Sequence, residues 1–199
     1  KVDGARPAIN GAFLIGHSTL RFNALGNDLA RQASAAEIGV MRDLLDQSLE
    51  QGAIGMSSGL FYPPAMAAST DEVAEVARPL GKWGGVYTAH MRDEGDDILK
   101  SMDETFEIGR RAGAPVVVSH HKCSGRANFG RMVETLPKFS EAMKSQEIAF
   151  DVYPYIAGST ILRSEMLDRA DKVLITWSDT VKDVSGRDLA DIAREMGCS

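Results

Sequence analysis

Two short apolar segments that each end in a histidine constrain the fold of this chain more than any other feature. Residues 85–90 and 115–120 have the composition of buried strands, and residues 96–113 between them are long enough for one helix. A strand, a helix and a second strand form a parallel pair with a right-handed crossover. His90 and His120 are therefore expected at the carboxyl ends of neighbouring strands, where α/β folds bind their ligands.

These two histidines are candidates for a shared metal site. Neighbouring strands lie roughly 4.8 Å apart, so the imidazoles of His90 and His120 can reach one zinc ion at Zn–N distances of about 2.0–2.1 Å. A single buried histidine is more often a packed or hydrogen-bonded core residue, and for each ring alone both interpretations stand. Their matching positions at two strand ends favour the metal site.

Composition argues against two classes of partner. The 199 residues carry a net charge of −6, which disfavours nucleic acid, and no apolar run approaches the ~20 residues of a membrane-spanning helix. No basic-then-apolar leader is visible, and Cys123 and Cys198 form no Cys-x-x-Cys pair. We therefore expect free thiols and a cytoplasmic location, since the cytosol is reducing.

Strands and helices alternate along most of the chain. Further strands are expected at 11–15, 53–58 and 147–152. Capping boxes that begin at Ser34 and Ser69 predict helices to about residues 50 and 80. Other helices are expected at 96–113 and at about 130–145, the last interrupted or restarted by Pro137. The C-terminal region is mixed, with a short strand within 172–177 and a helix over 188–196.

This alternation predicts an α/β protein with a parallel sheet of about five strands. No Gly-x-Gly-x-x-Gly follows a strand, which disfavours a dinucleotide fold, whereas polar strand ends favour a β/α barrel. Because side chains alternate across a strand, Thr88 and Val118, two residues before each inward histidine, are expected to face the barrel interior. The same argument turns Asp151 and Tyr153 inward on the last strand.

Other polar residues near strand ends have competing interpretations. His17 ends the first strand and is a further candidate ligand, but nearby Arg21 favours a structural hydrogen-bonding role. His121 has the opposite parity to His120 and is expected to pack outside the site. Asp151 is a candidate for orienting a metal-bound imidazole through its other ring nitrogen.

Two basic residues follow the histidines. Lys122 and Arg92 either recognise a substrate carboxylate or pair with neighbouring acids. For Lys122 both interpretations stand equally, while for Arg92 pairing within the acidic segment 93–96 is favoured. Three hydroxyl groups are candidate donors to an anionic group, namely those of Tyr153, Tyr155 and Ser159. Phe61 and Tyr62 either wall an apolar pocket or pack against their own loop.

Several short motifs in one order resemble the N-acyl-D-amino-acid deacylases (D-aminoacylases) of the amidohydrolase superfamily. They are GHSTLR at 16–21, GLFYP at 59–63, YTAHMRDE at 87–94, SHHK at 119–122, DVYPY at 151–155, GST at 158–160, ITW at 175–177 and SGRDL at 185–189. Each motif alone is weakly specific, but their joint order and spacing are highly specific. The resemblance covers almost the whole chain.

The resemblance implies a zinc-dependent β/α barrel that hydrolyses the amide bond of an N-acyl-D-amino acid to a carboxylate and a free D-amino acid. It implies that His90 and His120 are metal ligands on the fifth and sixth barrel strands. The resemblance also implies how a small-molecule substrate is bound. Its α-carboxylate is held by Lys122, Tyr153 and Ser159, and its side chain contacts Phe61 and Tyr62. Residues 160–184 are implied to cover the site.

The chain also lacks parts of the family pattern. It has no His-x-His pair, neither cysteine stands in the context of the family's ligating cysteine, and the general-base aspartate is expected beyond Ser199. Residues 1–199 are therefore expected to be the central part of a single catalytic barrel domain, roughly strands three to seven of eight. With two unpaired sheet edges, this fragment alone is expected to be inactive and poorly stable.

Two alternatives to this function stand beside it. One is hydrolysis of another linear or cyclic amide, and the other is a non-catalytic barrel fragment without the full metal set. Within the deacylase interpretation, no basic cluster lies near Phe61 and Tyr62 in the sequence. We therefore expect neutral or apolar D-side chains rather than acidic ones.

Overall fold

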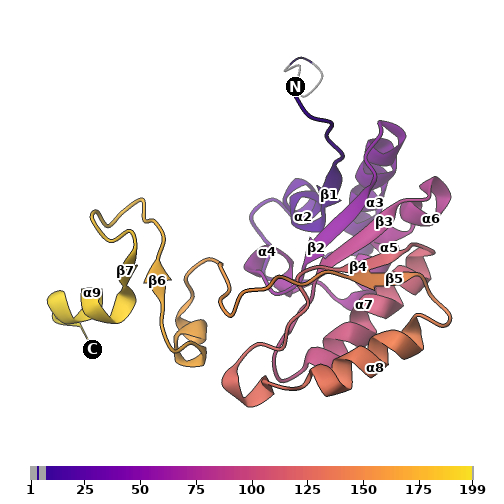
Figure 1. Cartoon of the computed structure of the whole chain (residues 1–199). Helices are drawn as coiled ribbons and strands as arrows, with labels where there is room; N and C mark the ends of the chain where they lie inside the picture. The colour runs from indigo at the N-terminus through magenta and orange to yellow at the C-terminus, as the bar shows by residue number, and fades with distance from the viewer. Residues whose placement is uncertain (1–3, 5–7, 199) are drawn as a thin grey trace. The chain divides into compact units, whose positions relative to one another are not determined.

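The computed structural model describes Gly4 and residues 8–198, which form two compact units (Figure 1). The first unit consists of Lys1–Ser124 and Asn128–Pro154, and the second of Gly125–Ala127 and Tyr155–Ser199. The first contains a five-stranded parallel sheet with its helices, and the second contains a two-stranded antiparallel sheet. None of the helices among the described residues is long and apolar enough to cross a lipid bilayer.

The parallel sheet follows the order of the chain. Its strands are β1 (Leu14–Gly16), β2 (Gly55–Gly59), β3 (Val86–His90), β4 (Val116–Val118) and β5 (Ile148–Phe150), and each pairs with the next. A doubly wound sheet reverses its strand order at the ligand site, whereas a β/α barrel does not. The prediction of an α/β fold with a partial β/α barrel is therefore confirmed.

Helices connect these strands in the predicted positions. They are α3 (Ala35–Glu50), α5 (Thr70–Ala77), α6 (Pro79–Trp83), α7 (Ile98–Ala112) and α8 (Met132–Ala142). Ser34 caps α3 with a complete capping box, because its Oγ accepts from Glu37 N while Glu37 Oε2 accepts from Ser34 N at 2.7 Å. Ser69 caps α5 in only half of this way, since the Glu72 carboxylate is used elsewhere in the fold.

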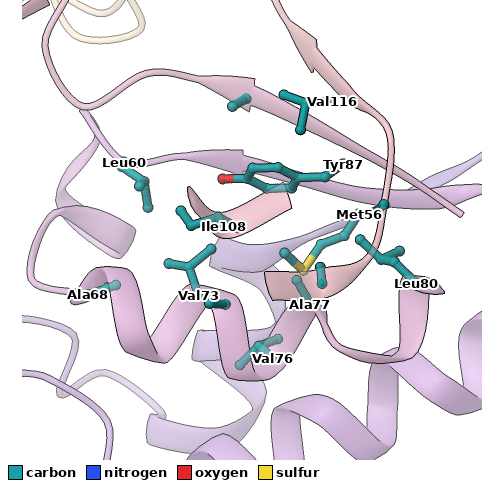
Figure 2. Close-up of a cluster of buried hydrophobic side chains, with 14 of the residues drawn as sticks. Met56, Leu60, Ala68, Val73, Val76, Ala77, Leu80, Tyr87, Ile108 and Val116 are labelled. Atoms are coloured by element: carbon teal, nitrogen blue, oxygen red, sulfur yellow. The ribbon is translucent and has the colours of Figure 1, made fainter. Parts of the chain in front are cut away.

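The core lies between the sheet and these helices (Figure 2). Met56, Tyr87 and Val116 project from neighbouring strands and are at most 1% exposed, and Val73 of α5 is fully buried beneath them. The hydroxyl of Tyr87 shares a 2.7 Å hydrogen bond with Ser58 Oγ. Burial raises the pKa of Tyr87, so this hydroxyl stays protonated and the bond is retained.

Two helices of the first unit were not expected. The segment α2 (His17–Leu25) begins directly after β1, and α4 (Pro63–Met66) lies within the expected loop 59–68. The buried face of α2 consists of His17, Leu20, Arg21 and Leu25, so two polar residues interrupt its apolar period. A one-turn helix such as α4 has too few residues to show any period.

Proline also acted differently from expectation in two places. The helix predicted over 69–80 ends at Ala77, and Pro79 begins α6 instead. In contrast, α8 continues through Pro137, which was expected to interrupt it. The fixed φ of proline is compatible with a helix, and the residue removes only one backbone hydrogen bond.

The second unit contains the short strand and helix that were expected. Strand β6 (Leu174–Ile175) pairs with β7 (Arg187–Asp188), and α9 (Leu189–Glu195) follows at once. Asp188 caps α9 by accepting a 2.8 Å hydrogen bond from Ala190 N. A short 3₁₀ segment (Ser164–Arg169) precedes β6. The site-covering role of residues 160–184 stays a prediction.

Two glycine substitutions test the packing of α7 against the strand that leads to His120. A Cβ at Gly109 would overlap Val116 Cγ2 and approach Gln146 Nε2 to 2.9 Å, whereas a Cβ at Gly39 in α3 meets nothing within 4 Å. We predict that Gly109→Ala destabilises the full-length protein by about 1–3 kcal/mol through overpacking. Gly39→Ala should stabilise it by about 0.5–1 kcal/mol, because alanine favours a helix. Denaturant unfolding checks both, and shifts of the same sign would contradict the described packing.

Candidate metal centre

His90 and His120 meet at the carboxyl ends of β3 and β4. His90 is the last residue of β3, and His120 follows β4 by two residues. His90 Nδ1 lies 2.9 Å from His120 Nε2, and the ring centroids are 4.6 Å apart. The topology therefore brings together the two rings that the sequence singled out, although their role as ligands stays a prediction.

The alternation argument for β4 was wrong. Val118 pairs with Ala89, and both are at most 1% exposed on the side of the sheet that the helices cover. Val118 therefore faces the helices and not the barrel interior. His120 nevertheless reaches His90 because its backbone has a left-handed φ of 43°, which ends the alternation of an extended strand.

Asp151 holds the backbone of this turn rather than an imidazole. Its Oδ1 accepts a 2.6 Å hydrogen bond from His120 N, and its carbonyl accepts one of 2.8 Å from His121 N. The ring of His120 instead contacts Glu94, whose Oε1 lies 3.1 Å from Nδ1. The position considered for Asp151 beside the imidazole is thus occupied by Glu94, a residue that the sequence suggested as a pairing partner for Lys122 or Arg92.

Glu94 completes a set of side chains that fits a metal ion. One ligand atom from each of His90, Glu94 and His120 lies within 4.8 Å of the other two. Two imidazoles and one carboxylate are donors that zinc and other divalent transition metals accept. The carboxylate of Glu94 contacts Nδ1 of His120, and Nε2 of the same ring is directed at His90. Metal-binding histidines are commonly oriented by a carboxylate in this way. A signal was available, since Glu94 follows His90 by four residues in the loop after β3.

The surroundings keep His90 neutral. Burial lowers the pKa of His90 to about 4, and electrostatic interactions with His120 and Lys122 lower it further. A neutral imidazole has the free lone pair that a metal ligand needs. Phe61 and Tyr62 contribute to this burial, with ring centroids 5.6 Å and 4.8 Å from that of His90.

Lys122 pairs with an acid, which is one of the two interpretations left open for it, and its role in binding a substrate carboxylate stays a prediction. Its Nζ lies 2.6 Å from Glu94 Oε2 and 3.0 Å from His120 Nδ1, so it is paired with an acid. It also lies 5.8 Å from the centroid of the Tyr153 ring. Burial, followed by the charge of Glu94, raises the pKa of Tyr153, which keeps its hydroxyl protonated as a donor. A cation and a donor thus lie beside the paired histidines.

The aromatic residues reach the site and also contact each other. Phe61 and Tyr62 pack edge to face with centroids 5.4 Å apart, and both rings lie against His90. They come from the segment between β2 and α4. Ser159 and Tyr155, in contrast, belong to the second unit, so their contact with a substrate stays a prediction.

Three other polar residues have structural roles. His121 packs outside the site, as predicted, with its Nε2 3.0 Å from Thr135 Oγ1 and its ring against Phe139. Arg92 pairs with an acid, as favoured, but the acid is Glu104 and not one of residues 93–96. His17 is fully buried with its Nε2 3.5 Å from Glu72 Oε1, outside the group of candidate ligands.

Curated relatives match nearly all of this chain. It is 50% identical over 192 residues to a D-aminoacylase of Alcaligenes xylosoxydans xylosoxydans. It is 46% identical to an N-acyl-D-aspartate deacylase and 41% identical to an N-acyl-D-glutamate deacylase of the same organism. These matches cover 96%, 96% and 99% of this chain but only 40%, 38% and 40% of the relatives, so the chain spans about 40% of their length. No protein-family model matches.

Solved structures agree with this comparison. A crystal structure of a D-aminoacylase, described as defining a novel subset of amidohydrolases, matches with a TM-score of 0.94 at 52% identity and covers 98% of this chain and 41% of its own. An N-acyl-D-glutamate deacylase from Bordetella bronchiseptica, in complex with zinc and a phosphonate inhibitor, matches with a TM-score of 0.94 at 41% identity, over 100% of this chain and 42% of its own. A further D-aminoacylase structure concerns a binuclear metal centre.

The candidate ligands predict a specific loss of metal. In a full-length protein that contains this chain, His90→Ala and His120→Ala should each weaken zinc binding by at least about 100-fold, and Glu94→Gln by about 10–100-fold. His121→Asn is the matched control, because His121 is adjacent in sequence but faces Phe139. Elemental analysis after dialysis measures the effect. Undiminished zinc in both alanine variants would refute the ligand assignment.

Proposed function

We propose that this chain, which belongs to the D-aminoacylase family of amidohydrolases, is the central part of a longer enzyme that hydrolyses N-acyl-D-amino acids. The reaction gives a carboxylate and a free D-amino acid. One observation carries the proposal: His90, His120 and Glu94 converge at two adjacent strand ends, in a chain whose relatives are named for this chemistry. Residues outside 1–199 are proposed to supply the remaining ligands and the general base.

We assign zinc to the site formed by His90 and His120. The neutral ring of His90 and the carboxylate-oriented ring of His120 support this assignment. A metal ion bound there polarises an amide carbonyl and acidifies water. The residues of this chain hold and orient the reactants around that ion. Glu94 also offsets the charge of Lys122, whose ammonium group would otherwise repel a divalent cation nearby.

The other site residues are proposed to fix the hand of the substrate. Lys122 and Tyr153 bind the α-carboxylate, and Ser159 of the second unit adds a hydroxyl donor. Their support is the placement of the Lys122 ammonium beside both His120 and the Tyr153 ring. Phe61 and Tyr62, whose rings lie against His90, line the side-chain pocket. A carboxylate, a side chain and a scissile amide held at three fixed places admit one configuration at the α-carbon.

We propose that the side chain of the substrate is neutral or apolar. An acidic side chain needs a cation beside Phe61 and Tyr62. Of the two arginines that contact this segment, Arg21 is paired with Glu72, and the other is Arg92 in the loop after β3. Its guanidinium is already engaged by Glu104 and by the carbonyls of Met66 and Ala68. It therefore has no evident role in binding a further carboxylate.

We also propose a reducing compartment such as the cytosol. Cys123 is half-buried and Cys198 is exposed, and both are free thiols. Burial raises the pKa of Cys123, which makes it less reactive. Disulfides are rare in reducing compartments, and free thiols are expected there.

Substrate profiling of the full-length protein tests the activity. We expect kcat/KM for N-acetyl-D-Met to exceed that for N-acetyl-D-Asp and N-acetyl-D-Glu by at least about tenfold, the amount that one unmatched buried charge costs in binding. N-acetyl-L-Met is the stereochemical control and should not be hydrolysed. Preference for the acidic substrates would overturn the side-chain assignment. Failure to hydrolyse any of the D-substrates would overturn the function.

The carboxylate role of Lys122 makes a separate prediction. Lys122→Gln removes a charge-assisted hydrogen bond of about 1.5–3 kcal/mol, so kcat/KM should fall about 10–100-fold, mainly through KM. Lys100→Gln is the control, because Lys100 of α7 is 82% exposed and pairs with Asp97, the residue that precedes this helix. Steady-state kinetics with N-acetyl-D-Met distinguish the two. Equal activity of both variants would contradict the assignment.

A further inference from the structure

The two aromatic residues beside His90, Phe61 and Tyr62, precede a short helix that depends on contacts with other elements for its position. Phe61 and Tyr62 immediately precede α4, a helix of four residues. Helices this short are not stable by themselves, because each hydrogen-bonded turn costs more conformational entropy than it returns. Within the segment, Ala65 N and Met66 N both donate to the carbonyl of Tyr62. These local bonds fix the shape of the turn, and Leu60 N, which donates to His90 O at 3.3 Å, fixes the start of the segment beside β3 but not its continuation into α4.

Two arginines from different elements donate to carbonyl groups of this segment. Arg21 of α2 donates from Nε to Pro64 O at 2.8 Å. Arg92, in the loop after β3, donates from Nη1 to Met66 O and from Nη2 to Ala68 O, both at 2.8 Å. Together these three bonds attach both ends of α4 to the rest of the first unit.

Each arginine is itself oriented by a glutamate from a different helix. Arg21 is fully buried and pairs with Glu72 of α5, which is 1% exposed. Arg92 forms a bidentate pair with Glu104 of α7, with both N–O distances at 2.8 Å. A planar guanidinium that is fixed on one side by a carboxylate directs its remaining donors along defined lines.

The remaining contacts extend this framework. Arg21 Nη2 also donates to Leu29 O at 3.1 Å and to Arg31 O at 2.6 Å, and Glu72 Oε2 accepts from Ala33 N at 2.9 Å. Buried ion pairs are often no more stabilising than well-packed apolar residues. What such a pair provides here is a fixed geometry for several backbone segments at once.

We infer that Arg21 and Arg92 are positioning residues that fix Phe61 and Tyr62 against His90 and thereby set which D-side chains are accepted. The inference rests on the proposed function. Neither guanidinium contacts His90, Glu94 or His120, so the effect passes through the backbone of residues 63–68. Loss of either arginine contact frees one end of α4. Phe61 and Tyr62 are then less well fixed, and the site discriminates less between substrate side chains of different size.

Variants of the half-buried Arg92 provide the main test in the full-length zinc-bound protein. Arg92→Lys keeps the charge but cannot reach Glu104 and two carbonyls together. The control is Arg78→Gln, since Arg78 is 61% exposed and pairs with Glu75 one turn away. Hydrogen exchange of peptides covering 59–68 should become at least about tenfold faster in Arg92→Lys. The zinc content should stay unchanged.

A substrate series provides the second measurement. The ratio of kcat/KM for N-acetyl-D-Met to that for N-acetyl-D-Ala should fall at least about fivefold in Arg92→Lys, because the larger side chain depends more on Phe61 and Tyr62. Arg21→Lys should change the same ratio in the same direction. It keeps a cation opposite Glu72 but loses the fork that reaches Pro64 O.

The outcomes separate the two claims. Exchange over 59–68 equal to that of Arg78→Gln would refute the positioning role, and so would faster exchange with an unchanged substrate ratio. A wild-type protein without activity on any N-acyl-D-amino acid would instead refute the proposed function. Loss of zinc in Arg92→Lys would assign the arginine to the metal site and contradict the inference.

Discussion

The left-handed turn at His120 is the constraint on which the candidate metal centre depends. An extended backbone would direct this side chain to the face where Val118 is buried under the helices. Such a conformation costs a non-glycine residue about 1–3 kcal/mol and persists only where its surroundings fix it. Asp151 fixes it by accepting from the backbone of His120 and His121. The distance between the His90 and His120 rings therefore depends on three consecutive strands, β3, β4 and β5.

Electrostatic balance follows from that geometry. Glu94 contacts both Nδ1 of His120 and the ammonium of Lys122, so one carboxylate orients a ring and offsets a cation. His90 remains neutral because aromatic rings and nearby positive charge disfavour its protonation. The neutral ring of His90 therefore has a lone pair that a metal ion can bind. The substrate-binding candidates lie close to each other, since Lys122 Nζ is 5.8 Å from the centroid of the Tyr153 ring.

Helix-capping motifs in the sequence predicted the structure correctly where their hydrogen bonds join residues close together in the chain. The capping box at Ser34 formed as expected, because its two hydrogen bonds join residues three apart. The same motif at Ser69 formed only half, because the Glu72 carboxylate is bound by Arg21, fifty-one residues away. For the same reason the sequence did not predict α2, because the buried face of this helix carries polar residues whose partners lie on other elements. Periodicity detects apolar faces and not buried ion pairs.

The sequence by itself determined the parallel α/β order and the placement of His90 and His120 at the ends of neighbouring strands. Both follow from the alternation of strands with helices and from strand spacing. The tertiary structure alone decided the turn at His120, the placement of Glu94 on its ring and the arginine contacts to α4. Each of these depends on a backbone irregularity or on partners distant in sequence, and neither leaves a periodic trace in the chain.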